Sequence, residues 1–509
     1  MIHSGTYRER VVIEKSGTPA SPIRFVAASG EHVVMTGADH IAKWEQAGSK
    51  SRIYKTPWPH RFITWNESNT HPSDDLHRMI GRAEQVFVNG YPLLQVLSRE
   101  QMSRGTFYVD LDEKELYVWG RGDEELDESR RVEASARERI WESKGDYIQV
   151  RGIRFRYAAN EAQHGAAEST GNHGVVEDCV FEKTNGAGAD FRGRDTTVRR
   201  CTFQDNGQLG FGASGAHHLH MTGCTIRDNN TKDFNRGWEA GGNKLCMSRG
   251  VVIESSSFIE NRGNGIRFDI GDEDCTVRNC LIADNEDAGI FYEISYGLHA
   301  HDNAITGNGF DSISDAWGAF RCRVLHCVIE RNLLVGNKEG FQFREQERTT
   351  PKIGQRRVEH PIWNHDEVIR SNVIALNRDA QVWGWFDVRD ERHWPAAMQT
   401  GEQKAPAKEQ PKDLSLEKLK LQFRDNVYCA AQGQGLFNWG VAWRRNKRYT
   451  GLGEARQELN LEEGGVIAEP RFADPTARDF RIPADSEILA MGCYPRGEVP
   501  GVTLGITPR

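Results

Sequence analysis

Residues 276–285 read TVRNCLIADN, and this short segment recurs along the chain in recognisable form. Residues 197–206 read TVRRCTFQDN, and residues 328–337 read VIERNLLVGN. In each copy a short run alternates apolar and polar side chains and then meets a polar turn, which is typical of short β-strands and not of helices. The segment therefore predicts a β fold built from one repeating unit.

Eight segments between residues 175 and 374 align with this unit, at intervals of roughly one coil of a solenoid. One aligned position holds a small side chain throughout: Cys179, Cys201, Cys224, Ser256, Cys280, Asn303, Asn332 and Asn372. Five residues later, every unit but the first, which has Thr184, carries an asparagine: Asn206, Asn229, Asn261, Asn285, Asn308, Asn337 and Asn377. Stacked coils place such residues above one another as buried ladders. The fold class is therefore predicted to be all-β, a right-handed parallel β-helix of the pectate-lyase-like kind, with a buried cysteine ladder that requires no disulfides.

Departures from the repeat divide the chain. Residues 1–40 are predicted to form the first coils, and residues 41–140 an inserted antiparallel, β-sandwich-like module, because alternating strands there meet at NG, LDEKE and RGDEE turns. Residues 141–394 are predicted to form the main β-helix with the active site. Residues 395–509 are expected to provide a linker, a last coil and a segment that caps the stack.

The composition excludes some classes of partner. A net charge of -8 over 509 residues argues against binding to nucleic acid or to an anionic membrane. No apolar run approaches the length of a membrane span, and the first residues lack the apolar core of a signal peptide. We expect either a cytoplasmic protein or an exported one whose signal precedes this chain. A homo-oligomer is compatible with the sequence.

Two carboxylates interrupt the repeat at matching positions. GIRFD (265–269) ends in Asp269, and GIFYE (289–293) ends in Glu293. By strand alternation, Ile266 and Phe268 point inward and both acids point outward, about 4.8 Å apart along the stack. Two carboxyls about 5 to 5.5 Å apart are the geometry of a retaining glycosidase. Like-charge repulsion would hold a proton on one of them. A bound Ca²⁺, an ion pair with Arg267, or no particular role are the alternatives.

GWEAGGNK (237–244), GIRFDI (265–270) and GIFYEIS (289–295), followed by DNAI (302–305), resemble the β-helical glycoside hydrolases of family 120, the β-xylosidase family. The resemblance implies an early inserted module, with Asp269 as nucleophile, Glu293 as acid/base and Glu239 as a sugar-binding carboxylate. The family usually has an aromatic residue before this Asp. Here Arg267 stands at the outward position two before Asp269, which is compatible with an acidic or sulfated sugar.

Other residues are candidates for binding the substrate. Trp238 is expected to stack on a sugar ring, and His299 to line the same cleft on the next coil. No cofactor is expected and no metal ligand is assigned, although structural Ca²⁺ is compatible with the acids. The preferred function is a retaining glycoside hydrolase acting on a plant or algal poly- or oligosaccharide. A polysaccharide lyase that uses Arg267 and Lys244, and a non-catalytic carbohydrate-binding β-helix, remain the alternatives.

Overall fold

The computed structural model describes residues 1–48, 51–62, 82–122, 126, 131–238, 240–309, 320–345, 348–362, 364–386, 420–441, 445–494 and 499. The chain divides into two compact units. The first comprises residues 1–193, 201–212 and 228–240, and the second comprises residues 194–200, 213–227 and 241–509. In the described residues, no helix has the length and apolar character needed to cross a membrane.

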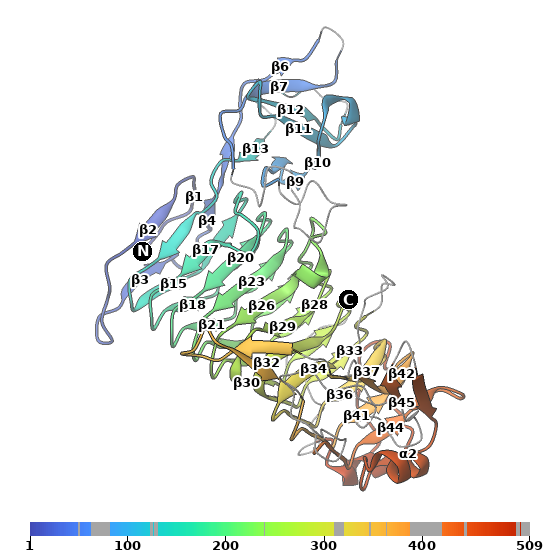
Figure 1. Cartoon of the computed structure of the whole chain (residues 1–509). Coiled ribbons are helices and arrows are strands. Elements are labelled where there is room, and N and C mark those ends of the chain that lie inside the picture. The colour runs from blue at the N-terminus through green and yellow to red at the C-terminus, as the bar shows by residue number, and fades with distance from the viewer. Residues whose placement is uncertain are drawn as a thin grey trace. The chain divides into compact units, whose positions relative to one another are not determined.

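Parallel ladders of short strands form the coils of the first unit (Figure 1). One ladder stacks β1 (Gly5–Tyr7), β4 (Val33–Thr36), β16 (Ile153–Arg156), β19 (Val180–Glu182) and β22 (Thr202–Gln204). A second stacks β2 (Val11–Ile13), β14 (Trp141–Ser143), β17 (Gly165–Ser169) and β20 (Ala187–Phe191). A third stacks β3 (Ile23–Val26), β15 (Ile148–Arg151) and β18 (Val175–Glu177). Strands β1 to β4 therefore belong to the coils.

Two small sheets lie between these coil strands in the sequence. One sheet has the order β10 (Leu94–Val96), β11 (Thr106–Asp110), β12 (Glu115–Trp119), β7 (Tyr54–Pro57) and β6 (Glu45–Gln46). The other has the order β5 (Ala38–His40), β13 (Val132–Ser135), β8 (Val86–Val88) and β9 (Tyr91–Pro92). Their pairings are antiparallel, except that β10 and β11 run parallel. The sheets share a core that includes Phe107, Leu116 and Val132.

Three parallel ladders also form the coils of the second unit (Figure 1). The first stacks β25 (Thr225–Arg227), β28 (Ser257–Ile259), β31 (Leu281–Ala283), β33 (Ala304–Thr306), β36 (Leu333–Val335), β41 (Val373–Ala375), β44 (Val427–Cys429) and β47 (Val466–Ile467). The second stacks β26 (Gly241–Cys246), β29 (Ile266–Asp269), β32 (Ile290–His301), β34 (Phe320–Leu325), β37 (Glu339–Glu345), β42 (Ala380–Phe386) and β45 (Gly435–Val441).

The third ladder begins with β21 (Thr197–Arg199), β24 (His220–Thr222), β27 (Val252–Glu254) and β30 (Glu273–Arg278), continues through the last residues of β32, and ends with β35 (Val328–Glu330), β40 (Val368–Arg370) and β43 (Gln422–Arg424). The parallel β-helix predicted from the repeat is thus confirmed. Residues 422–441 contribute one more coil, through β43, β44 and β45. Residues 395–419 lie outside the described residues.

The predicted asparagine ladder is present and fully buried. The Asn308 side-chain amide donates to the Asn337 Oδ1 of the next coil at 2.9 Å and to the Ile282 carbonyl at 3.0 Å. The Asn308 Oδ1 in turn accepts from the backbone N–H and the side-chain amide of Asn285, at 3.1 and 2.9 Å. Each asparagine therefore satisfies backbone groups of turns that face away from water. The cysteines at the other ladder position are buried and are not joined in disulfides.

The C-terminal segment packs where the sequence does not place it. Phe480, Ile488 and Tyr494 join a buried cluster with Leu333 and Val373, which face outward from the β31–β33–β36–β41–β44 ladder. The sequence predicts instead that this segment covers the end of the stack. At that end lie α2 (Leu452–Leu459) and β46 (Arg445–Tyr449), which pairs antiparallel with β45. The apolar outer face of the ladder thus explains why the tail follows the side of the coils.

A carboxyl group ends a second asparagine ladder. Asn303, Asn332, Asn372 and Asn426 are linked in series. Asn426 and the Tyr428 hydroxyl then donate to Glu462, at 3.0 and 2.6 Å. Burial raises the pKa of Glu462 from 4.5 to about 7, against the opposing effect of these hydrogen bonds.

We predict that this carboxyl makes stability depend on pH. The pKa of Glu462 is higher in the folded protein than in the unfolded chain, so its protonated carboxyl stabilises the fold. This stabilisation is complete below about pH 4.5 and is lost as the pH rises through 7. A shift of this size corresponds to at most roughly 3 kcal/mol. Glu462→Gln should therefore flatten the pH profile of the melting temperature between pH 5 and 8. Glu463→Gln, on the exposed neighbour, is the control. A wild-type melting temperature that does not fall over this interval would contradict the prediction.

Candidate active site

Asp269 and Glu293 lie side by side on successive coils. Strands β29 and β32 pair in register, with Arg267 opposite Phe291 and Phe268 opposite Tyr292, so that the next pair along is Asp269 and Glu293. Ile266 and Phe268 are fully buried inside the coil, as the alternation predicts. Both acids are also buried, at 6% and 7% exposure. The pair therefore lies in a covered site and not on an open solvated face.

Arg267 bridges the two carboxylates. Its Nη2 lies 3.1 Å from Glu293 Oε2 and 3.5 Å from Asp269 Oδ2. Its guanidinium also lies over the Phe291 ring, 5.1 Å from the centroid. Burial lowers the pKa of Arg267, but the charges of Asp269 and Glu293 outweigh that effect and raise it. The guanidinium is therefore a permanent cation between the acids.

Two further cations complete the site. Lys244 on β26 places Nζ 3.1 Å from Asp269 Oδ2, and both side chains are about nine-tenths buried. Arg348 reaches Glu293 Oε1 at 3.2 Å from β38 (Arg348–Pro351), which pairs with β39 (Glu359–Ile362) as a hairpin (Figure 1, gold). The sequence predicts Lys244 and Arg267 here, but not Arg348. Arg348 lies in a charged loop outside the repeat, so the repeat does not predict its position.

These cations correct the electrostatic part of the sequence argument. From the sequence we expect two carboxylates that repel each other, so that one of them retains a proton. In the structure, Arg267 lies between them and each acid has one additional basic partner. The ion pair considered as an alternative is therefore present. The same cations oppose Ca²⁺ binding by this pair, because the negative charge that would attract the ion is already compensated.

A buried carboxyl beneath the site holds its backbone in place. Asp272 accepts from the backbone N–H of Asp269 at 3.2 Å and from that of Ser248 at 2.8 Å, and burial raises its pKa. The turn between them includes Gly271, with φ of +70°. A Cβ at Gly271 would lie 2.5 Å from the Pro351 carbonyl of the hairpin. Glycine therefore permits both the turn and the close approach of the strand that carries Arg348.

Of the three other predicted binding residues, His299 is the one whose side chain the structure describes, and its contacts lie outside this cluster. His299 pairs with Glu330 at 3.2 Å and stacks near His301. Left-handed residues at Ile294 and Gly297 turn the chain before it, so that its part of β32 pairs with β30 and not with β29. The expectation that His299 lines the cleft is therefore not met by its contacts. Glu239 and the side chain of Trp238 lie outside the described residues.

The first unit contains another carboxylate pair, which sequence reasoning missed. Glu168 and Asp190 are opposite each other on β17 and β20, with His164 within reach of both. Burial raises the pKa of Asp190, against the charge of Arg192. The Glu168 pKa is lowered, because His164 and Arg139 outweigh its burial. GAAES (165–169) and AGADF (187–191) lie opposite each other and repeat one another only weakly, and only their alignment within the stack would have revealed this pair.

The comparisons with known proteins agree with this fold. Residues 164–332 match the family described as right handed beta helix region. The chain is similar to a solved structure described as the complex of XylC with xylose, with 16% identity over 86% of this chain and 79% of that one, and a TM-score of 0.63. It is also similar to a structure described as a glycoside hydrolase, with 13% identity over 91% and 88% and a TM-score of 0.42. No curated protein matches the sequence. The chain is therefore a right-handed parallel β-helix, as predicted.

Arg267→Gln tests whether the central cation stabilises the site. Removing one partner from a buried ion network leaves charge uncompensated, which costs about 3 to 5 kcal/mol. Lys244 and Arg348 still pair with one acid each in this variant. Urea unfolding measures the loss of stability.

The control for this test is Arg249→Gln. Arg249 pairs with Glu273 but is about half exposed, so its loss should stay within about 1 kcal/mol. Equal losses of stability for the two variants would contradict the role assigned to Arg267.

Proposed function

We propose that this protein is a retaining glycoside hydrolase that acts on an oligo- or polysaccharide bearing an acidic group. The observation that carries the proposal is the pair Asp269 and Glu293, buried on adjacent coils with one oxygen of each within 3.5 Å of the same arginine nitrogen. Oxygens that share a nitrogen in this way fit the short carboxyl separation of retaining enzymes better than the wider separation of inverting ones.

Each carboxyl has a distinct role in the proposed reaction. Asp269 attacks the anomeric carbon and forms a glycosyl ester as the bond to the leaving oxygen breaks, and Glu293 supplies the proton to that oxygen. In the second step Glu293 takes a proton from water, whose oxygen displaces Asp269 from the sugar. The assignment follows the resemblance in sequence. It is supported by Asp272, which fixes the backbone of Asp269.

The cations provide the argument for an acidic sugar. A general acid must carry a proton before it can donate it, and Glu293 is paired with both Arg267 and Arg348. A carboxylate or sulfate on the substrate is a competing partner for these guanidiniums. Its binding would free Glu293 from at least one of them, so that protonation no longer costs a strong ion pair. A neutral sugar offers no such exchange.

The fold comparison supports the choice of first substrates. The structure described as XylC with xylose shares this fold at a TM-score of 0.63. Xylose-containing substrates, with and without uronate branches, are therefore the first to test. Other uronate-bearing and sulfated plant and algal polysaccharides follow.

A polysaccharide lyase is the second candidate, and the same cations favour it. Arg267 and Arg348 would neutralise the uronate carboxylate, and Lys244 would remove the proton next to it. That reaction releases an unsaturated uronate, which absorbs in the ultraviolet, whereas hydrolysis does not. The product therefore separates the two reactions.

We predict that Asp269→Asn abolishes hydrolysis of all substrates, because no other group forms the glycosyl ester. Glu293→Gln should lower the rate by roughly 10²- to 10⁴-fold on natural linkages, the usual contribution of a general acid. On aryl glycosides of acidic phenols, Glu293→Gln should lower the rate of the first step much less, because such leaving groups depart without a proton. Reducing-sugar release, phenol release and product anomer are the measurements.

The matched control is Glu273→Gln, which changes a carboxylate of the neighbouring strand β30 that pairs with Arg249 at the surface. It should retain nearly wild-type rates. An inverted product would contradict the retaining mechanism. An ultraviolet band that survives in Asp269→Asn would favour the lyase. Binding of a polysaccharide without any product would leave a carbohydrate-binding β-helix as the function.

A further inference from the structure

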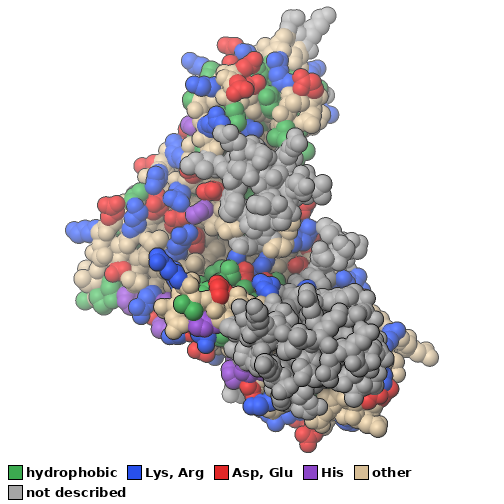
Figure 2. Space-filling view, viewed as in Figure 1, with side chains coloured by type: hydrophobic (Ala, Val, Ile, Leu, Met, Phe, Trp, Pro, Cys, Tyr) green, Lys and Arg blue, Asp and Glu red, His purple; other side chains and the backbone are tan. Residues whose placement is uncertain are grey.

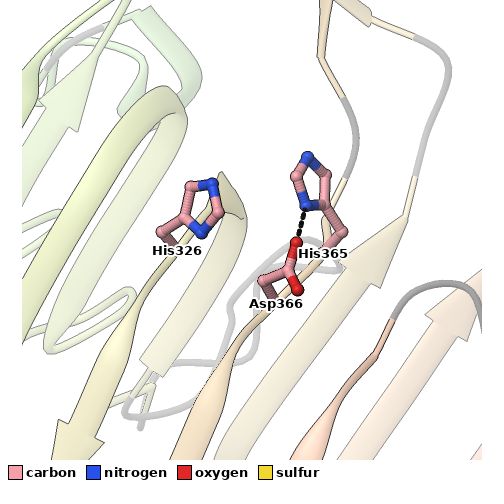
Figure 3. Close-up of side chains that lie close together, drawn as sticks. All are labelled: His326, His365 and Asp366. Atoms are coloured by element: carbon pink, nitrogen blue, oxygen red, sulfur yellow. Dashed lines mark hydrogen bonds and ion pairs between the residues drawn. The ribbon is translucent and has the colours of Figure 1, made fainter.

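Two imidazoles and a carboxylate converge at an edge of the second unit (Figure 3). His326 lies in the turn between β34 and β35, while His365 and Asp366 lie in the turn between β39 and β40 of the next coil. One ligand atom from each side chain lies within 4.8 Å of those of the other two. Figure 3 shows the ring nitrogens of His326 facing the pair. None of these residues takes part in the proposed hydrolysis.

The backbone fixes the three residues relative to one another. Strands β35 and β40 are in register from Val328 and Val368 onward, which sets His326 opposite Asp366. Both of these residues adopt left-handed conformations, with φ of 57° and 56°. The His326 backbone N–H also donates to the His365 carbonyl at 3.2 Å. The side chains therefore start from anchored positions, and bringing them together costs little backbone entropy.

Their chemistry matches a metal ligand set. The His365 Nδ1 and Asp366 Oδ2 are already 2.6 Å apart, and the His326 and His365 rings are T-shaped with centroids 5.2 Å apart. Ligands of a tetrahedral zinc ion lie roughly 3.3 Å from each other. Small side-chain rotations bring the three atoms to that spacing.

A similar group of histidines and carboxylates lies on the same side of the coils, but it has a different cation beside it. His299 and His301 are also neighbours, with Glu330 and Asp302 as partners. There Arg331 pairs with both carboxylates, at 2.7 and 2.8 Å, and supplies the positive charge. At His326 the nearby cation is Lys420, two-thirds exposed and 3.5 Å from Asp366. An exposed lysine is easily displaced by a divalent ion, because such pairs contribute little.

We propose that His326, His365 and Asp366 bind a divalent cation of the zinc class and thereby link two successive coils. Imidazole nitrogen selects zinc, nickel, cobalt or copper over Mg²⁺ and Ca²⁺, which prefer oxygen. The ion takes the place of the hydrogen bond between His365 and Asp366, and His365 then carries its proton on Nε2. Three protein ligands leave one position for water.

The test is calorimetric titration of the whole, metal-free protein with Zn²⁺ alone and, separately, with Ca²⁺. We expect one Zn²⁺ site with a Kd below about 10 µM and no Ca²⁺ binding there. His326→Asn and His365→Gln should each weaken Zn²⁺ binding at least tenfold. Asparagine is chosen at position 326 because it tolerates the left-handed conformation. Zn²⁺ should also raise the melting temperature of the wild type, but not that of either variant.

The matched control is His218→Asn. His218 is a left-handed turn residue with φ of 58°, paired with Asp195, and its replacement should leave Zn²⁺ affinity unchanged. The melting temperatures without metal show whether each variant is folded. The proposal is overturned if the wild type fails to bind Zn²⁺, if His326→Asn binds as tightly as the wild type, or if His218→Asn weakens binding as much.

Discussion

The stacking of coils in register is the constraint on which the rest of this structure depends. A ladder asparagine such as Asn308 donates to the asparagine of the next coil and to a backbone carbonyl, so a coil shifted by one residue would lose both bonds. It would also turn its apolar side chains outward, because side chains alternate along a strand. Residues separated by one coil of sequence therefore become neighbours at the spacing of hydrogen-bonded strands. A site that needs two neighbouring side chains can therefore be formed by residues at matching positions of adjacent repeats.

The protein uses this constraint at several places. Asp269 and Glu293 meet on β29 and β32, and Glu168 and Asp190 meet on β17 and β20 of the first unit. In each case basic side chains neutralise the paired acids. On the face shown in Figure 2, acidic and basic side chains are interspersed, in line with the modest net charge. The paired acids are distinguished from this background by their burial.

The repeat made the coils predictable because it is local and periodic. The asparagine and cysteine ladders, the inward apolar positions and the adjacency of Asp269 and Glu293 all follow from counting residues along the sequence. The position of Arg348 could not be predicted in this way. Arg348 lies on a hairpin whose position depends on contacts such as that of Pro351 with Gly271. The ladder to which His299 belongs could not be predicted for a related reason. The sequence does not show that Ile294 adopts a left-handed conformation, which turns the following residues onto another ladder.

The identity of the nucleophile is the most direct test of this account. Once the released sugar is known, its 2-deoxy-2-fluoro glycoside with a good leaving group should trap the glycosyl ester. The fluorine slows both steps, and the good leaving group restores the rate of the first step alone, so the ester accumulates. Peptide mass spectrometry then locates the label. The account predicts a label on Asp269. A label on Glu293, Glu168 or Asp190, or turnover of the natural substrate with no trapped ester, would contradict it.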